Sequence, residues 1–246
     1  MKNLTICKAK SYENMSAKAA EIVLEQIKAK PDTLLGLATG STPVGMYQEL
    51  IEAHRTKDAS FHRCVSVNLD EYAGLAPEHE QSYRYFMQEN LFDHIDILPK
   101  NTHLPQGDVA DFEAECHRYS KLLQELGTVD LQVLGLGHNG HIAFNEPATY
   151  FPTHTHLVDL DEQTIEANAR FFESEQDVPR RALSMGLLEI FQAKHILLLV
   201  SGKEKAEILA KSFQETVEPS VPASILQFHP RVTLVGDEEA LSMLGS

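Results

Sequence analysis

Short apolar runs alternate with longer amphipathic stretches along the chain, and this alternation constrains the fold more than any other feature. The runs with the composition of strands are LTICKA (4–9), TLLGLA (33–38), VSVNL (65–69), DLQVLGLG (130–137), HLVDLD (156–161), HILLLV (195–200) and VTLVGD (232–237). Most are rich in Val, Leu and Ile with little alternation, which is typical of strands buried on both faces.

Stretches with helical periodicity separate these runs, at residues 11–28, 43–54, 111–126 and 203–213. Strands that alternate with helices of about ten or more residues predict βαβ units. We therefore expect an α/β fold with a doubly wound, mainly parallel, Rossmann-like sheet and helices on both faces. Since no repeat or Pro/Gly/Ser linker interrupts the pattern, we expect one domain over residues 1–246.

The formal net charge of −15 argues against nucleic acid or an anionic membrane surface as a partner, since both favour a basic stripe. An anionic small molecule stays possible if it meets a local basic pocket. Cys7, Cys64 and Cys116 are far apart, so we expect neither a disulfide framework nor a structural zinc site. Without a signal-peptide pattern or an apolar run near the ~20 residues of a membrane span, the cytoplasm is the expected location.

Ligands of such sheets bind beyond the carboxyl ends of the strands, so functional residues are expected there. After the run at 33–38, Thr39, Gly40, Ser41 and Thr42 offer hydroxyls and backbone N–H groups where a helix begins near Pro43. A helix N-terminus attracts anions, which makes this segment a candidate phosphate site. A plain turn with an N-cap is the alternative, and a Walker loop is absent.

Two acids, Asp70 and Glu71, follow the run at 65–69. Neighbouring carboxylates raise one another's pKa, and one of them could act as a general base. In the alternative interpretation, Asp70 caps a turn and Glu71 faces solvent.

The densest polar cluster lies in LGLGHNGHIAFNEP, residues 134–147, and contains His138, Asn139, His141, Asn145 and Glu146. His141 could shuttle a proton near neutral pH while Glu146 orients or charges it. Three alternatives stay open: a GxGxxG dinucleotide site, a metal site at His138 and His141, and a structural loop with His138 exposed. Pro147 and Pro152 disfavour the dinucleotide site, because they interrupt the stretch where its helix would run.

Two basic residues complete the candidates, namely Arg170 in NARFF and Lys205 in SGKEKAE. Lys205 follows the run at 195–200 and opens a helix, so it is expected at the ligand edge of the sheet. Lys203 is equally well placed by sequence, and any of these residues could be an ordinary surface charge.

Together these segments resemble the glucosamine-6-phosphate deaminase (glucosamine-6-phosphate isomerase) family from about residue 1 to 240. The family segments TG[GS]TP, NxDEYxGL, GHIAFNEP, NxRFF and GxxKA correspond to residues 39–43, 68–75, 140–147, 168–172 and 202–206. The resemblance implies isomerising deamination of D-glucosamine 6-phosphate with water to D-fructose 6-phosphate and ammonia, in amino-sugar catabolism. It implies no metal and no organic cofactor.

The resemblance also implies residue roles. Asp70 matches the base that moves a proton between C2 and C1, His141 the group that opens the pyranose ring, and Glu146 its charged partner. The residues that match phosphate contacts are Thr39, Gly40, Ser41, Thr42, Arg170 and Lys205, which favours Lys205 over Lys203.

One departure from the family is Asn139, which stands where many members have Asp. Asn can orient the imidazole of His141 but cannot supply a negative charge, so we expect Glu146 to carry more of that task. Allosteric members bind N-acetylglucosamine 6-phosphate partly through basic residues shortly after FNEP. Because His156 and Val158 lie near those positions here, we expect no such activation.

Two other functions share part of this pattern. A 6-phosphogluconolactonase would keep the phosphate loop but needs hydrolysis, which the intact GHIAFNEP and NLDEY segments do not favour. A sugar-phosphate sensor would not need Asp70 with His141 and Glu146, and would normally be fused to a DNA-binding module. A homo-oligomer is possible, since members of the family differ in oligomeric state.

Overall fold

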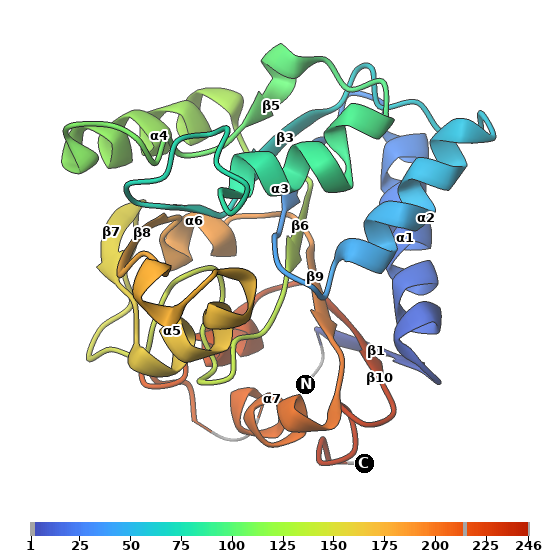
Figure 1. Ribbon diagram of the computed structural model, residues 1–246. Coiled ribbons are helices and arrows are strands. Elements are labelled where there is room, and N and C mark those ends of the chain that lie inside the picture. Colours follow the sequence, from blue (N-terminus) through green and yellow to red (C-terminus); the bar gives the residue numbers. More distant parts are fainter. Residues whose placement is uncertain (1–2, 214–215, 246) are drawn as a thin grey trace.

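A seven-stranded sheet forms the centre of the molecule, in the order β1-β10-β9-β6-β2-β3-β5 (Figure 1). The computed structural model describes residues 3–213 and 216–245. The strands are β1 (Leu4–Ala9), β2 (Leu34–Leu37), β3 (Val65–Asn68), β5 (Thr102–His103), β6 (Leu131–Leu134), β9 (Ile196–Val200) and β10 (Val232–Asp237). Every pairing in this sheet is parallel, which agrees with the prediction.

Helices cover both sides of the sheet. They are α1 (Tyr12–Ala29), α2 (Val44–Arg55), α3 (Tyr83–Asn90), α4 (Phe112–Leu126), α5 (Glu162–Asn168), α6 (Leu187–Phe191) and α7 (Ala206–Ser212). Figure 1 shows α1 and α2 on one side, with α4, α5 and α6 on the other. The predicted doubly wound α/β fold is therefore confirmed. Within the described residues, no helix has both the length and the apolar character needed to cross a membrane.

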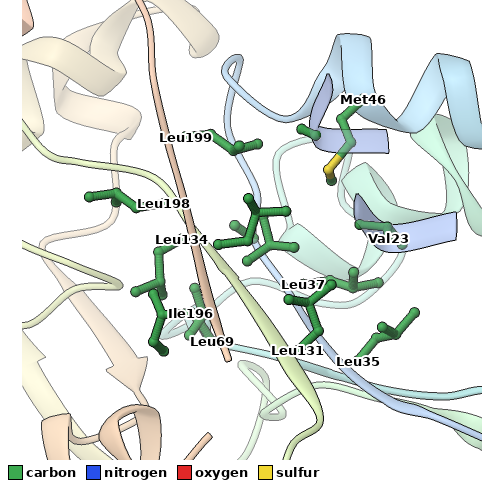
Figure 2. Close-up of a cluster of buried hydrophobic side chains, with 14 of the residues drawn as sticks. Val23, Leu35, Leu37, Met46, Leu69, Leu131, Leu134, Ile196, Leu198 and Leu199 are labelled. Carbon is green, nitrogen blue, oxygen red and sulfur yellow. The ribbon is translucent and has the colours of Figure 1, made fainter. Parts of the chain in front are cut away.

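The central strands are buried on both faces, which explains why their sequences lack alternation. All residues of β2, β6 and β9 are buried. Figure 2 shows side chains from these strands packed together, among them Leu35, Leu131 and Leu198, with Val23 of α1 and Met46 of α2 beside them. Full burial of one such side chain contributes about 1.5–3 kcal/mol. This core therefore fixes the positions of the carboxyl ends of the central strands.

A second, smaller sheet departs from the sequence analysis. It is antiparallel, with the order β4-β8-β7, and contains β4 (Asp70–Tyr72), β7 (His156–Asp159) and β8 (Arg181–Ser184). The run at 156–161 belongs here and not to the parallel sheet, and its strand is partly exposed. Such partial exposure suits an antiparallel sheet with one face in solvent.

The strand order reverses between β2 and β6. From β2 the chain proceeds outward to β3 and β5, whereas from β6 it proceeds the other way to β9 and β10. In open α/β sheets, the crevice at such a reversal is the usual place for a ligand. The loops that follow β2, β3, β6 and β9 therefore meet at one edge.

Candidate functional site

A cavity of about 880 Å³ opens at this reversal point. The predicted residues that line it are Thr39, Gly40, Ser41, Thr42, Asp70, Asn139, His141, Arg170 and Lys205. Glu146 lies behind this wall and contacts His141. Segments that are up to about two thirds of the chain apart thus meet because they follow neighbouring parallel strands.

The segment Thr39–Thr42 joins β2 to the N-terminus of α2. Pro43 precedes that helix and provides no side-chain cap. Instead, the hydroxyl of Tyr12 donates to the Ser41 carbonyl (3.0 Å) and accepts from the Gly45 N–H (2.8 Å). This hydroxyl fixes the loop against the first turn of α2, so the remaining N–H groups of the turn and the helix dipole are available to an anion.

Arg170 and Lys205 bring two cations to the same cavity. Nη2 of Arg170 lies 3.4 Å from Oγ of Ser41, and its guanidinium stacks 4.7 Å from the ring centre of Phe171. Burial, together with the charge of Arg170, lowers the pKa of Lys205 to about 8, although Glu204 opposes the shift. Among the ion pairs within residues 3–213 and 216–245, none involves Arg170 or Lys205. Two unpaired cations beside a helix N-terminus favour a bound anion.

Asp70 presents a buried carboxylate to the cavity from the first position of β4, opposite Ser184. Burial raises its pKa well above the usual value, and the charge of Glu71 adds to the increase. No hydrogen bond or ion pair formed by the described side chains engages this carboxylate. Asp70 therefore does not cap a turn, so that alternative interpretation is wrong.

Glu71 is buried as well, which contradicts the alternative that it faces solvent. Its carboxylate accepts the backbone N–H groups of Tyr72 (2.9 Å), Tyr83 (2.8 Å) and Arg84 (2.9 Å). Burial raises its pKa to about 7, and these bonds and the charge of Arg84 limit the increase. Glu71 thus ties β4 to the start of α3 and places Tyr83 in the cavity wall.

His141 and Glu146 form a hydrogen-bonded pair, with 3.3 Å between Nδ1 and Oε2. The same Oε2 accepts a hydrogen bond from Nδ2 of Asn139 (2.6 Å), and Oε1 accepts one from the Thr164 hydroxyl (2.6 Å). Burial would raise the pKa of Glu146, but the bond and charge of His141, with the bonds from Thr164 and Asn139, hold it below its usual value. The pair leaves Nε2 of His141 as the ring nitrogen without a hydrogen-bond partner among the described residues.

The backbone around His141 is held closely. A side chain at Gly137 would place its Cβ 2.3 Å from the imidazole, so only glycine lets the ring lie there. The buried Asn145 donates to the carbonyls of Ile142 (2.9 Å) and Met185 (2.8 Å). Asn145 is thus a structural residue of the GHIAFNEP segment, and its bonds fix the loop between His141 and Glu146.

Three alternative interpretations of residues 134–147 are a dinucleotide site, a metal site and a structural loop with His138 exposed. From β6 to β7 the described chain forms turns and no helix, so GLGHNG is not followed by the helix of a dinucleotide site. Across residues 3–213 and 216–245, no group of three or more His, Cys, Asp and Glu side chains is arranged to hold a metal ion. His138 is exposed at the cavity wall.

Several lining residues were not predicted from the sequence, namely Tyr12, Tyr83, Phe144, Gln163, Thr164, Asn168, Ser201 and Glu204. Most belong to helix starts or turns whose position depends on tertiary packing. Asn168, for example, donates to the Tyr72 hydroxyl (2.9 Å) across a separation of 96 residues. Local signals exist for Tyr12, Tyr83 and Gln163, because each lies in the first turn of a helix after a recognisable N-cap, namely Ser11, Ser82 and Asp161.

The fold and the cavity define an α/β protein with an anion site next to groups able to transfer protons. Residues 8–234 match the family described as glucosamine-6-phosphate isomerases/6-phosphogluconolactonase, and the chain belongs to this family. It is 53% identical over 241 residues to the glucosamine-6-phosphate deaminase of a Geobacillus species, which covers 98% of this chain and 96% of that one.

Solved structures agree with this assignment. A monomeric glucosamine-6-phosphate deaminase superposes with a TM-score of 0.95 at 48% identity, covering 97% of this chain and 99% of the other. The 6-phosphogluconolactonase of Thermotoga maritima superposes with a TM-score of 0.77 at 20% identity, over 95% of this chain and 99% of that one. At this identity, the second likeness shows a common fold alone.

Proposed function

We propose that the chain is an enzyme that converts D-glucosamine 6-phosphate and water to D-fructose 6-phosphate and ammonia. One observation carries this proposal. A single cavity is lined by an anion site with two cations, by His141 of the His–Glu pair, and by the buried carboxylate of Asp70. Within the described residues, neither the two cations nor Asp70 forms an ion pair. These are the groups that a phosphorylated amino sugar requires.

The surroundings of Asp70 favour an amino sugar over a lactone. Deamination develops positive charge at the carbon that carries nitrogen, and an uncompensated carboxylate nearby stabilises that charge. Lactone hydrolysis develops a negative oxygen, which the same buried carboxylate would repel. The near 50% identity to deaminases, against 20% to the lactonase of Thermotoga maritima, supports the same choice.

In the proposed first stage, the phosphate binds at Thr39–Thr42 with Arg170 and Lys205. Charge-assisted contacts are stronger than neutral ones, and a bidentate Arg also fixes orientation. Nε2 of His141 then donates a proton to the ring oxygen while the C1 hydroxyl gives its proton to water, and the sugar opens to its aldehyde form. Glu146 stabilises the protonated imidazole before the transfer.

In the second stage, the ammonium group at C2 first gives a proton to water. Asp70 then removes the proton from C2 while water protonates the carbonyl oxygen at C1, which gives an enolamine. Asp70 returns its proton to C1, leaving an iminium group at C2. Water adds to C2, ammonia leaves, and fructose 6-phosphate remains. The ammonium or iminium group of the substrate compensates the buried charge of Asp70, so the carboxylate can ionise when substrate is bound.

Every proposed step moves a proton or a water molecule, so the proposal uses neither a metal nor an organic cofactor. The partner is a small sugar phosphate, and nucleic acid and membranes have no part in it. We further propose that the chain acts as one domain, since β1 and β10 pair although they are far apart in sequence. The three free cysteines support a reducing compartment such as the cytoplasm.

The direct test is ammonia release from glucosamine 6-phosphate in the presence of EDTA, with fructose 6-phosphate assayed in parallel. Equal amounts of both products are expected. Folded protein that releases no ammonia, even after divalent metal is restored, would refute the proposal and make 6-phosphogluconolactone the next substrate to try.

The pKa of Lys205 predicts how sugar-phosphate binding depends on pH. Lys205 is charged below about pH 8 and loses its proton above it, so affinity is expected to fall as the pH rises through this value. Calorimetry with fructose 6-phosphate, which has no amine to titrate, should show binding weaker by up to roughly tenfold at pH 9 than at pH 7. Lys205→Arg keeps its charge and should flatten the profile, and equal slopes for both proteins would contradict the assignment.

A further inference from the structure

Asp237 is a buried acid at the carboxyl end of β10 that the proposed reaction does not use. β10 pairs in parallel with β9, and Gly236 lies opposite Val200. The next residues along the two strands are therefore Asp237 and Ser201. This register brings the Asp237 carboxylate to the loop that leads from β9 into the cavity.

The two carboxylate oxygens of Asp237 have different partners. Oδ1 accepts the N–H of Ala240 (2.8 Å), which is an ordinary cap of its own turn. Oδ2 reaches across to the neighbouring strand and accepts both the Ser201 hydroxyl (2.5 Å) and the Gly202 N–H (2.9 Å). The bonds of Oδ2 to Ser201 and Gly202 do not stabilise the turn after β10. They hold the loop after β9 instead.

Ser201 and Gly202 begin the segment that carries Lys205. Both line the cavity, and the Gly202 carbonyl accepts the N–H of Lys205 (3.1 Å) to close the short helical turn Lys203–Lys205. Two hydrogen bonds in series thus run from the buried carboxylate through Gly202 to the backbone of Lys205. Nothing else in the turn is anchored by a charged side chain of the described chain.

We propose that Asp237 is a positioning residue of the phosphate site, which holds Ser201 and Gly202 so that Lys205 faces the bound phosphate. The inference rests on the proposed function, because it takes Lys205 as a phosphate contact. Asp237 does not touch the ligand and acts only through the turn. Asp suits the position because an ionised carboxylate offers acceptors alone, and Ser201, Gly202 and Ala240 together present three donors.

The test is Asp237→Asn, which keeps the size of the side chain but replaces one acceptor with a donor. KM for glucosamine 6-phosphate should rise roughly tenfold while kcat changes by less than about threefold, because the misplaced cation affects binding of the remote phosphate. The dissociation constant of inorganic phosphate should rise by a similar factor. In a Lys205→Ala background, Asp237→Asn should add less than about a factor of two.

Asp130→Asn is the matched control. Asp130 is also a buried acid, but it lies at the amino end of β6, on the side of the sheet away from the cavity, where it binds Lys30 and Lys194. This variant should lose stability but keep KM and phosphate affinity. A structural role alone for Asp237 would make the two variants behave alike.

An unchanged KM in folded Asp237→Asn would overturn the proposal, as would a full, independent effect in the Lys205→Ala background. If Asp237→Asn does not fold, Ser201→Ala removes one of the two cross-strand donors. It should raise KM roughly threefold, and this effect too should vanish without Lys205. Phosphate binding by the wild type distinguishes failure of the proposed deaminase activity from failure of the proposed role of Asp237. If the wild type binds phosphate but releases no ammonia, only the deaminase activity is refuted. If it neither binds phosphate nor releases ammonia, both proposals are refuted.

Discussion

Asp70→Asn is expected to reduce kcat by about 10²–10⁴-fold, the usual contribution of a positioned general base. The amide keeps the shape of the side chain but cannot accept the C2 proton. Fructose 6-phosphate binding should stay within a few fold of wild type, since the phosphate contacts come from other loops. Steady-state kinetics with calorimetry of the product measures both quantities. A large loss of affinity with retained turnover would contradict the proposed role.

The same substitution is expected not to lower stability. Burial raises the pKa of Asp70, so the folded protein holds its proton more strongly than the unfolded chain does. Above the usual pKa, ionisation therefore favours unfolding, and wild type loses stability as the pH rises toward the folded value. Asn avoids this cost. At pH 7 the Tm of Asp70→Asn should equal or exceed that of wild type, although activity is nearly lost.

Asp130 gives the opposite result, which makes it a control for the substitution itself. Burial would raise its pKa, but bonds from Lys194, Lys30 and the Leu34 N–H hold it at about 2. A pKa of about 2 in place of the usual 3.8 corresponds to about 2 kcal/mol, present above pH 4 and lost as the pH falls through 2. Asp130→Asn should therefore lower Tm at pH 7 and leave kcat unchanged.

The parallel sheet could be predicted because its strands are buried on both faces. Short apolar runs such as residues 195–200 and 232–237 predict buried strands. The longer helices between the strands show the helical spacing of their apolar residues. The loops after the strands followed from the same inference, since parallel strands place their carboxyl ends at one edge. Thus a common cavity for Thr39–Thr42 and a lysine of the turn after residues 195–200 could be inferred from topology, whereas only the family resemblance favoured Lys205 over Lys203.

The antiparallel sheet could not be predicted in the same way. β4 has three residues and β8 has four, which are too few to show a period, and β4 directly follows a strand of the other sheet. The hydrogen bonds that hold the site residues in place also cannot be predicted from the local sequence. Glu146 and Thr164 are 18 residues apart, and Asp237 and Ser201 are 36 apart, so only the fold brings them together.

Glu146→Gln is expected to lower kcat/KM by about 2- to 30-fold at neutral pH. Hydrogen bonds to a charged group contribute about 1.5–3 kcal/mol, against about 1 kcal/mol for a neutral pair. The substitution isolates the charge, because the amide oxygen can still accept from Asn139 and His141. The amide N–H₂ can then donate to Thr164, whose hydroxyl rotates to accept it. The geometry around His141 therefore survives while the negative charge is lost.

The pH profile should carry the signature of this loss. The pKa of Glu146 lies below its usual value, so wild type keeps the charge through the neutral and mildly acidic range. Glu146→Gln has no charge at this position to lose, so its deficit relative to wild type should be largest in this range and should shrink as the pH falls through the pKa of Glu146. The acid limb of kcat/KM should therefore contain the titration of Glu146 in wild type and lack it in Glu146→Gln. An unchanged rate at neutral pH would show that Glu146 only orients the ring.

Asn139 offers a rescue that separates charge from orientation. Its Oδ1 accepts the backbone N–H of His141 (3.2 Å), and an Asp could make the same bond while it restores a negative charge beside the imidazole. In the Glu146→Gln background, the amide turns its N–H₂ toward position 139 to avoid a contact between two acceptor oxygens, so Asn139→Asp should recover part of kcat/KM through its charge and not through the hydrogen bond to His141. In wild type the same change should be harmful, because Nδ2 of Asn139 lies 2.6 Å from Oε2 of Glu146 and two carboxylates there would repel. The opposite signs in the two backgrounds would identify one negative charge next to His141 as the requirement, whichever residue supplies it.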